Sequence, residues 1–167
     1  MATPASELAS GGETDHGIVL EGRRKMIVED AMALFQCKPS LELFKRGWRE
    51  DAVFADPIVT AVGFRQYAAQ WFGMPAAFPA SETLAWKVTR NEPGFIEYEQ
   101  QQKYTIAVIK TTKVMSSLVH IELDNEEYVT KFEDRWDAKA LSYGGIASFF
   151  KGINARTMPY LITVPKQ

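Results

Sequence analysis

The spacing of apolar residues predicts three helices in the first half of the chain. The first spans about residues 19–36 and ends before Pro39, because proline cannot continue a helix. The second begins after Ser40, whose hydroxyl can accept a hydrogen bond from a free amide of the first turn. The third starts near Gly63 and ends at Gly73-Met74-Pro75. The apolar faces of these helices comprise Leu20, Ile27, Ala31 and Leu34; Leu41, Phe44 and Trp48; and Phe64, Tyr67, Ala68 and Trp71.

The second half of the chain predicts strands. After Pro79, apolar Leu84, Trp86 and Val88 alternate with polar residues, which is the period of a half-buried strand. Longer strands follow over residues 95–108, 114–123 and 128–137, with turns at 91–94 and 124–126. A short strand over 52–55 separates the second and third helices. This order implies an α+β fold, a cone-shaped barrel in which helices pack in a curved, mostly antiparallel sheet.

The length of 167 residues fits one domain. Residues 1–17 lack periodicity and are predicted to be a disordered N-terminal tail, and residues 18–167 form the single domain. That domain ends with a helix predicted over about 146–154 and an apolar segment over 158–164. Such a segment must be covered, so we expect it to close the mouth of the cone or to cross to a second subunit.

Composition excludes several function classes. The formal net charge of -2 argues against a nucleic-acid partner, which would need a basic surface. A single cysteine, Cys37, excludes a disulfide framework and a cysteine zinc site, and His16 and His120 do not make a metal site. No span approaches about 20 apolar residues, so no membrane partner is expected. We therefore expect a cytoplasmic protein without metal or cofactor.

Asp56 is the first candidate for chemistry, because it ends a short apolar strand just before Pro57. If that strand lines a hollow, the apolar surroundings raise the pKa of the carboxyl and make it a better base. Aspartate before proline is also a common turn residue, whose side chain caps backbone amides of its own loop. Both interpretations remain open at the level of sequence.

Asp134 is the second candidate. Strand parity places it with Phe132 and Trp136, the predicted core side of the last strand. A carboxylate that faces inward needs either a proton or a partner such as an arginine or lysine. If Asp56 and Asp134 share one cavity, their environments can split their pKa values into one acid and one base.

The strand over 95–108 carries paired glutamine and tyrosine residues on one face. These side chains suit the orientation of a polar ligand atom, although a solvated face or a dimer contact would use them equally well. The opposite face is more charged, which favours the inward placement. The predicted ligand-binding residues are Tyr67, Trp71, Trp86, Tyr98, Gln100, Gln102, Tyr104, Phe132 and Trp136.

The order of these elements resembles the NTF2-like superfamily, and within it the SnoaL-like and ketosteroid-isomerase-like branch. The resemblance rests on the run from Trp48 to Pro57 (WREDAVFADP), the Gly63 helix entry and the run from Phe132 to Asp137 (FEDRWD). It implies that Asp56 acts as a base and that Asp134 acts as an acid or base on a late strand. The first helix, however, lacks the tyrosine that isomerases of this branch use as oxyanion donor, so steroid isomerisation is not expected.

Two functions follow from different classes. The first is a cofactor-free isomerase, cyclase or dehydratase that acts on a small apolar molecule of polyketide-like or terpenoid-like type. The alternative is a non-catalytic ligand-binding or dimerisation module, in which the aspartates hold turns and ion pairs. We also expect a homodimer through the convex sheet face, where Val114, Leu118 and His120 share one phase.

Overall fold

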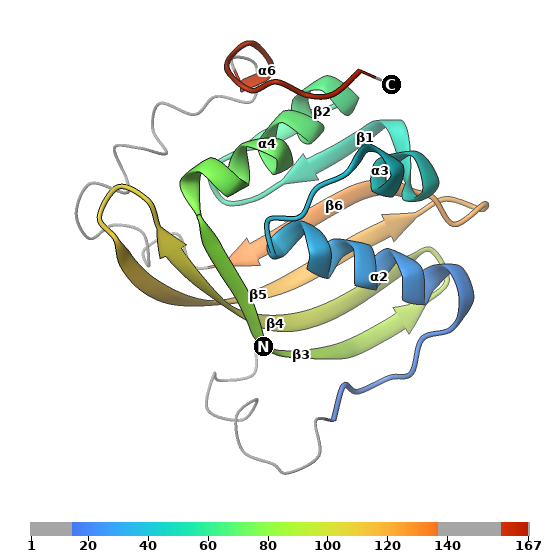
Figure 1. Cartoon of the computed structure of the whole chain (residues 1–167). Helices are drawn as coiled ribbons and strands as arrows, with labels where there is room; N and C mark the ends of the chain where they lie inside the picture. Colours follow the sequence, from blue (N-terminus) through green and yellow to red (C-terminus); the bar gives the residue numbers. More distant parts are fainter. Residues whose placement is uncertain (1–14, 137–157, 167) are drawn as a thin grey trace.

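A curved six-stranded sheet forms the body of the molecule in the computed structural model, which describes residues 15–136 and 158–166 (Figure 1). The strand order is β2-β1-β6-β5-β4-β3, in which only β1 and β6 are parallel neighbours. The sheet is therefore mixed and mostly antiparallel, as expected. The strands are β1 (Trp48–Ala55), β2 (Thr60–Val62), β3 (Ala80–Glu92), β4 (Phe95–Ile106), β5 (Thr111–Leu123) and β6 (Val129–Trp136).

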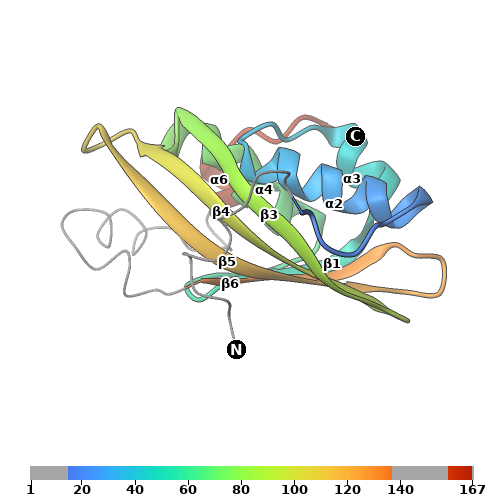
Figure 2. The ribbon, with the colours of Figure 1, turned by 90° about the horizontal axis from the view of Figure 1, so that it is seen from below.

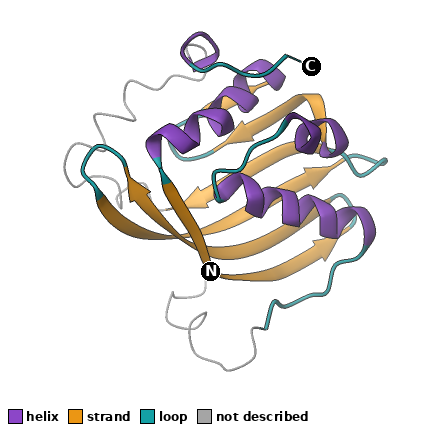
Figure 3. Ribbon diagram, in the orientation of Figure 1, coloured by secondary structure: helices purple, strands orange, loops and turns teal. Residues whose placement is uncertain are grey.

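The helices lie on the concave side of this sheet (Figure 2). They are α2 (Gly22–Phe35), α3 (Leu41–Gly47), α4 (Phe64–Ala77) and the short α6 (Met158–Leu161), which lies beside α4 (Figure 3). None of the helices in the described part of the chain has the length and apolar character needed to cross a bilayer. The helix predicted over 146–154 lies outside the described residues.

The predicted start of the second helix is confirmed, and the predicted end of the third helix is wrong. The amide of Leu43 donates to the Ser40 hydroxyl over 3.2 Å, so Ser40 caps α3 as expected. The third helix does not end at Pro75 but continues to Ala77. Proline removes a single amide near the end of this helix, and the bond from the Phe78 amide to the Met74 carbonyl (2.8 Å) closes the last turn.

Replacing the cap residue Ser40 with alanine is expected to lower the free energy of unfolding by about 1 kcal/mol, because a first-turn amide loses its acceptor. Urea denaturation followed by circular dichroism measures this difference. Ser40→Asn, which retains a capping oxygen, should restore most of it. Equal losses in both variants would contradict the capping role.

A β-bulge in β3 overturns the predicted phase of that strand. The pairing register with β4 shifts between Thr83 and Ala85, so one extra residue turns the chain. Leu84 is consequently 45% exposed, whereas Val88 is 2% exposed and belongs to the core. The alternation of Leu84, Trp86 and Val88 therefore predicted the strand correctly but placed Leu84 on the wrong face.

The core is an aromatic cluster between the helices and the concave face of the sheet. The ring of Phe132 from β6 lies 5.3 Å from that of Trp48, 5.7 Å from Trp71 and 6.0 Å from Phe35. A smaller cluster of Phe78, Tyr104 and Ile106 packs separately, with Met74, Met115, Cys37, Ala77 and Trp136 against it. The concave face thus has an aromatic centre and a second apolar region beyond it.

The convex face carries charges rather than a continuous apolar surface. His120 lies on it as expected, with Nδ1 at 2.8 Å from a Glu97 carboxylate oxygen. Arg135 pairs with Glu133 over 3.0 Å on the same face. The homodimer through this face stays a prediction.

The segment just before α2 lies along β3, although the sequence assigns residues 15–17 to the tail. The His16 ring stacks on Trp86 at 4.1 Å, and the Val88 amide donates to the His16 carbonyl over 2.8 Å. Gly17 leaves no room for a side chain, because an added Cβ would lie 2.2 Å from the Val88 oxygen. These contacts cover the outer edge of β3.

Candidate functional site

The pairing register of three strands brings the predicted polar residues together. Tyr98 on β4 pairs with Val119 on β5, which in turn pairs with Asp134 on β6. Directly paired residues point to the same side of a sheet, so Tyr98 and Asp134 share the concave face. Gln100 and Trp136 form the next row on that face, on either side of Ser117.

Asp134 is a buried carboxyl without a charged partner in the described part of the chain. It is 8% exposed, and its Oδ1 has no hydrogen-bond partner among the described residues. The pKa of Asp134 is raised from 3.8 to about 8, and burial is the largest cause. The charge of Asp56 adds to this rise, whereas interaction with the Ser117 hydroxyl opposes it. Asp134 therefore holds its proton at neutral pH. No arginine or lysine partner of Asp134 is found among the described residues, and the neighbouring Arg135 pairs with Glu133 on the convex face.

Asp56 lies beside Asp134. The parallel register pairs Phe54 of β1 with Phe132 of β6. Asp56 lies two residues after Phe54, and Asp134 lies two residues after Phe132. Asp56 Oδ1 accepts hydrogen bonds from the amides of Ile58 (2.8 Å) and Val59 (2.7 Å). Burial raises the pKa of Asp56 and these two bonds lower it. The structure thus brings the two aspartates together and also shows the turn-capping contacts expected for Asp56.

Several buried polar atoms of the described residues lack hydrogen-bond partners. Four of these atoms have no hydrogen-bond partner among the described residues: Tyr98 OH, Gln100 Oε1, Trp71 Nε1 and Gln70 Nε2. Buried polar groups in native proteins are normally satisfied, and exceptions mark bound water, ligands or catalytic roles. Tyr98 lies in the row of Asp134 and Gln100 in the next row, so a hydroxyl and an amide oxygen without partners lie close to this carboxyl on the concave face.

Comparison with known proteins supports the fold. No family model and no curated protein matches this chain. Solved structures do match over most of their length. An NTF2-like protein from Anabaena variabilis superposes with a TM-score of 0.60 at 11% identity, over 73% of this chain and 96% of that one. A candidate SnoaL-like polyketide cyclase from Jannaschia gives 0.59 at 13% identity, over 75% and 95%. A candidate isomerase of the SnoaL-like family from Agrobacterium tumefaciens gives 0.54 at 15% identity, over 70% and 98%.

The chain has the NTF2-like fold. The resemblance inferred from the Asp56-Pro57 strand end and the late aspartate strand is thereby confirmed at the level of architecture. Identities this low carry no residue roles, so the site must be judged from its own geometry.

The remaining predicted ligand residues divide into three groups within the NTF2-like cone. Trp71 and Phe132 belong to the aromatic centre, with their rings 5.7 Å apart. Tyr104 and Trp136 belong to the smaller apolar cluster, where the Tyr104 ring lies 4.6 Å from Phe78. Trp86 stacks on His16 at the outer edge of the sheet.

Gln102 and Tyr67 are engaged elsewhere. The Gln102 amide nitrogen donates to the Ser81 hydroxyl (2.7 Å) and the Phe35 carbonyl (3.2 Å), and its oxygen accepts from Thr83 (2.8 Å). Gln102 therefore ties α2 to the sheet. Tyr67 packs on Trp48 and donates to the Arg49 carbonyl over 3.1 Å, at the start of β1. Tyr67 thus lies at the opposite end of β1 from Asp56, and the structure does not bring it to the aspartates.

Sequence reasoning missed Ser117 and gave Cys37 no role beyond packing. Ser117 shares its phase with buried Val119, and this parity was the available signal. Its hydroxyl accepts from Gln100 Nε2 over 3.3 Å. Burial raises the pKa of Cys37 to about 11, so its thiol is unreactive at neutral pH.

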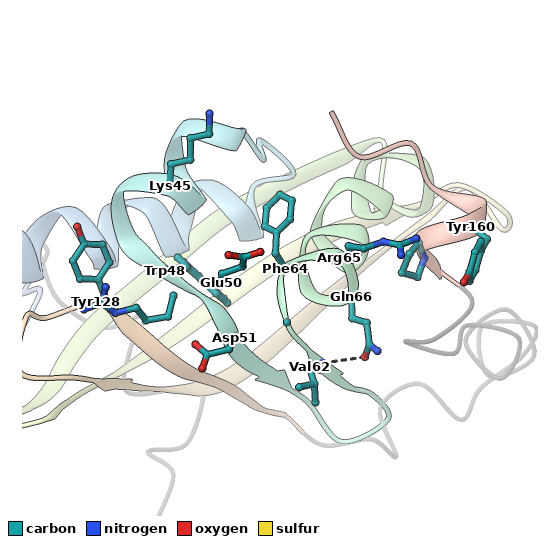
Figure 4. Close-up of a pocket in the computed structure, with 13 residues that line it drawn as sticks. Lys45, Trp48, Glu50, Asp51, Val62, Phe64, Arg65, Gln66, Tyr128 and Tyr160 are labelled. Atoms are coloured by element: carbon teal, nitrogen blue, oxygen red, sulfur yellow. Dashed lines mark hydrogen bonds between the residues drawn. The ribbon is translucent and has the colours of Figure 1, made fainter. Parts of the chain in front are cut away.

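A surface groove of about 1170 Å³ lies away from the aspartates (Figure 4). It runs past the start of β1 and the start of α4, and both charge signs line it. Figure 4 shows Glu50 near Phe64 and Arg65 beside Tyr160. The groove contacts the start of β1, whereas Asp56 follows its end, and each residue between them adds about 3.3 Å along the strand. The groove and the aspartate site are therefore distinct.

Proposed function

We propose that this protein is an acid–base catalyst of SnoaL-like type, acting without a cofactor on a small, largely apolar molecule. The observation that carries this proposal is the pair of neighbouring carboxyls on the concave face, each with a raised pKa and each with different partners. Pairs of titratable groups whose environments separate their pKa values are typical of acid–base sites.

The two aspartates suit opposite roles. Asp56 receives two backbone amides, which favour its charged form, so it serves as the base. Asp134 retains its proton at neutral pH and serves as the acid. In an isomerisation, the Asp56 carboxylate takes a proton from a carbon next to a carbonyl while Asp134 donates its proton to the carbonyl oxygen. The product of this step is an enol, Asp56 is then neutral and Asp134 is an anion.

Asp134 also supplies what the first helix lacks. The expected oxyanion tyrosine is absent from α2, but a protonated carboxyl and the Tyr98 hydroxyl lie in one row of the sheet. Donors held in a dry site stabilise a developing enolate more strongly than water does. The surrounding aromatic residues suit a polyketide-like or terpenoid-like substrate.

Hydrogen–deuterium exchange tests this proposal. Wild-type protein in deuterated buffer should accelerate exchange at the acidic carbon of cyclic 1,3-diketones and related apolar ketones, followed by proton NMR. Asp56→Asn should reduce the rate by about 100-fold or more, because the base is lost. Asp51→Asn, an exposed carboxylate on the same strand, is the matched control and should leave the rate unchanged. Equal rates for wild type and Asp56→Asn would remove Asp56 as the base.

A non-catalytic ligand-binding module is the second candidate, and the capping of the 56–59 turn by Asp56 favours it. In that case Asp56→Asn would lower stability without affecting any turnover. Retained binding of an apolar ligand by a protein that exchanges no ketone protons would support this alternative.

A further inference from the structure

The concave face contains a polar pair that the proposed reaction does not yet use. Ser117 lies on β5 between Gln100 on β4 and Trp136 on β6. Asp134 occupies the neighbouring row, so Ser117 and Asp134 are diagonal neighbours on one face. Ser117 is therefore the polar side chain of β5 nearest to the carboxyl in the strand register.

The direction of the hydrogen bonds is set by Gln100. Its Nε2 donates to Ser117 Oγ over 3.3 Å, so the serine oxygen acts as an acceptor on that side. A hydroxyl has one proton, which Ser117 is then free to donate on its other side. Asp134 lies diagonally across from Ser117 on the same face, and interaction with the Ser117 hydroxyl lowers the pKa of Asp134.

We propose that Ser117, held by Gln100, is a positioning residue that orients the Asp134 carboxyl and sets its protonation. The inference rests on the proposed function, in which Asp134 is the acid. Asp134 Oδ1 has no partner among the described residues, so this oxygen stays available to a ligand.

Other titratable groups face Asp134, and they do not replace this role. Asp56 follows β1, and its negative charge raises the pKa of Asp134 by repulsion. The charge of Asp134 raises the pKa values of Tyr98 and Tyr104 on β4, and Cys37 also raises that of Tyr104. On the α4 side, the Trp71 ring packs on Phe132 and does not titrate. Of these groups, Asp56 is repulsive to the Asp134 anion, whereas the Ser117 hydroxyl favours it.

The test measures the titration of Asp134 directly and needs no substrate. Protein labelled with ¹³C at aspartate carboxyls is titrated from pH 5 to 10, and Asp134→Asn identifies the Asp134 signal by its loss. Ser117→Ala should raise the midpoint by about one pH unit, because a hydrogen bond to the charged form is lost. Ser117→Thr, which keeps the hydroxyl, should restore the wild-type midpoint.

Ser116 is the matched control, since it is the adjacent serine on the opposite, convex face. Ser116→Ala should leave the Asp134 midpoint unchanged. Gln100→Met is a second variant that keeps Ser117 and should shift the midpoint upward by a smaller amount, because the serine proton loses its preferred direction. If Ser117→Ala does not fold, the midpoint shift in Gln100→Met provides the test.

An unchanged midpoint in Ser117→Ala, or an equal shift in Ser116→Ala, would overturn the inference whatever the activity. A shifted midpoint together with full turnover in Asp134→Asn would leave the inference standing and reject the proposed function. The two failures are therefore distinguishable.

Discussion

Asp134→Asn is expected to lower turnover by about 100-fold or more and, at the same time, to make the fold more stable than wild type at pH 8. The amide keeps the shape of the carboxyl but carries no transferable proton, so the acid is lost. The gain in stability follows because asparagine cannot acquire the buried negative charge that wild type acquires at high pH. A merely structural residue would show the opposite combination, lower stability with unchanged turnover.

The sign of the pH dependence follows from the raised pKa of Asp134. In the unfolded chain the group titrates near 3.8, and in the folded protein near 8. Between these values the native state holds a proton that the unfolded state has released, so stability falls as pH rises. The loss approaches about 1.4 kcal/mol per pH unit in that window and ends above pH 8. Below pH 4 both states are protonated, and wild type and variant should be nearly equal.

Chemical denaturation of both proteins at pH 4.5, 6, 7 and 8.5 measures this difference. We expect the unfolding free energy of Asp134→Asn to exceed that of wild type by an amount that grows from the lowest to the highest pH. Asp51→Asn, which changes an exposed carboxylate, should show no such growth. A constant difference at all four pH values would contradict the raised pKa.

Phe132→Ala is expected to have the largest effect on stability, a loss of about 3–5 kcal/mol in the free energy of unfolding. Phe132 is 1% exposed, and its ring contacts those of Phe35, Trp48, Phe54 and Trp71. These rings come from α2, β1 and α4. Removing Phe132 therefore leaves a cavity at the junction of three elements that cannot all close on it.

Urea denaturation measures this loss, and Phe95→Ala is the control. Phe95 is an aromatic residue of the same sheet that stacks on His120 at 5.1 Å on the convex side and is only half-buried. It should cost less than half as much as Phe132. Similar losses in the two variants would contradict the placement of the core on the concave face.

The sequence determined the architecture where local patterns repeat over many residues. Helical spacing before Phe78, alternation after it, and the capping serine at residue 40 sufficed to predict an α+β fold with helices in a curved sheet. Strand parity also placed Asp134, Tyr98 and Gln100 on one face, because side chains of a strand point alternately to its two sides.

Local patterns were insufficient where the outcome depended on neighbours from distant segments. Pro75 lies inside α4, since tertiary packing of that helix outweighs one lost hydrogen bond. Leu84 left its predicted face, because the register with β4 inserts a bulge that β3 alone does not encode.

The candidate site shows the same division. The sequence predicted Asp56 and Asp134 as the candidate carboxyls, one just after a short strand and one on the last strand. Only the tertiary structure decided that they are neighbours, that Asp134 lacks a cationic partner in the described residues, and that Ser117 lies beside it. The physical reason is that burial and charge interactions depend on all groups within a few ångströms, and those groups are brought together by strand order, which no local pattern specifies.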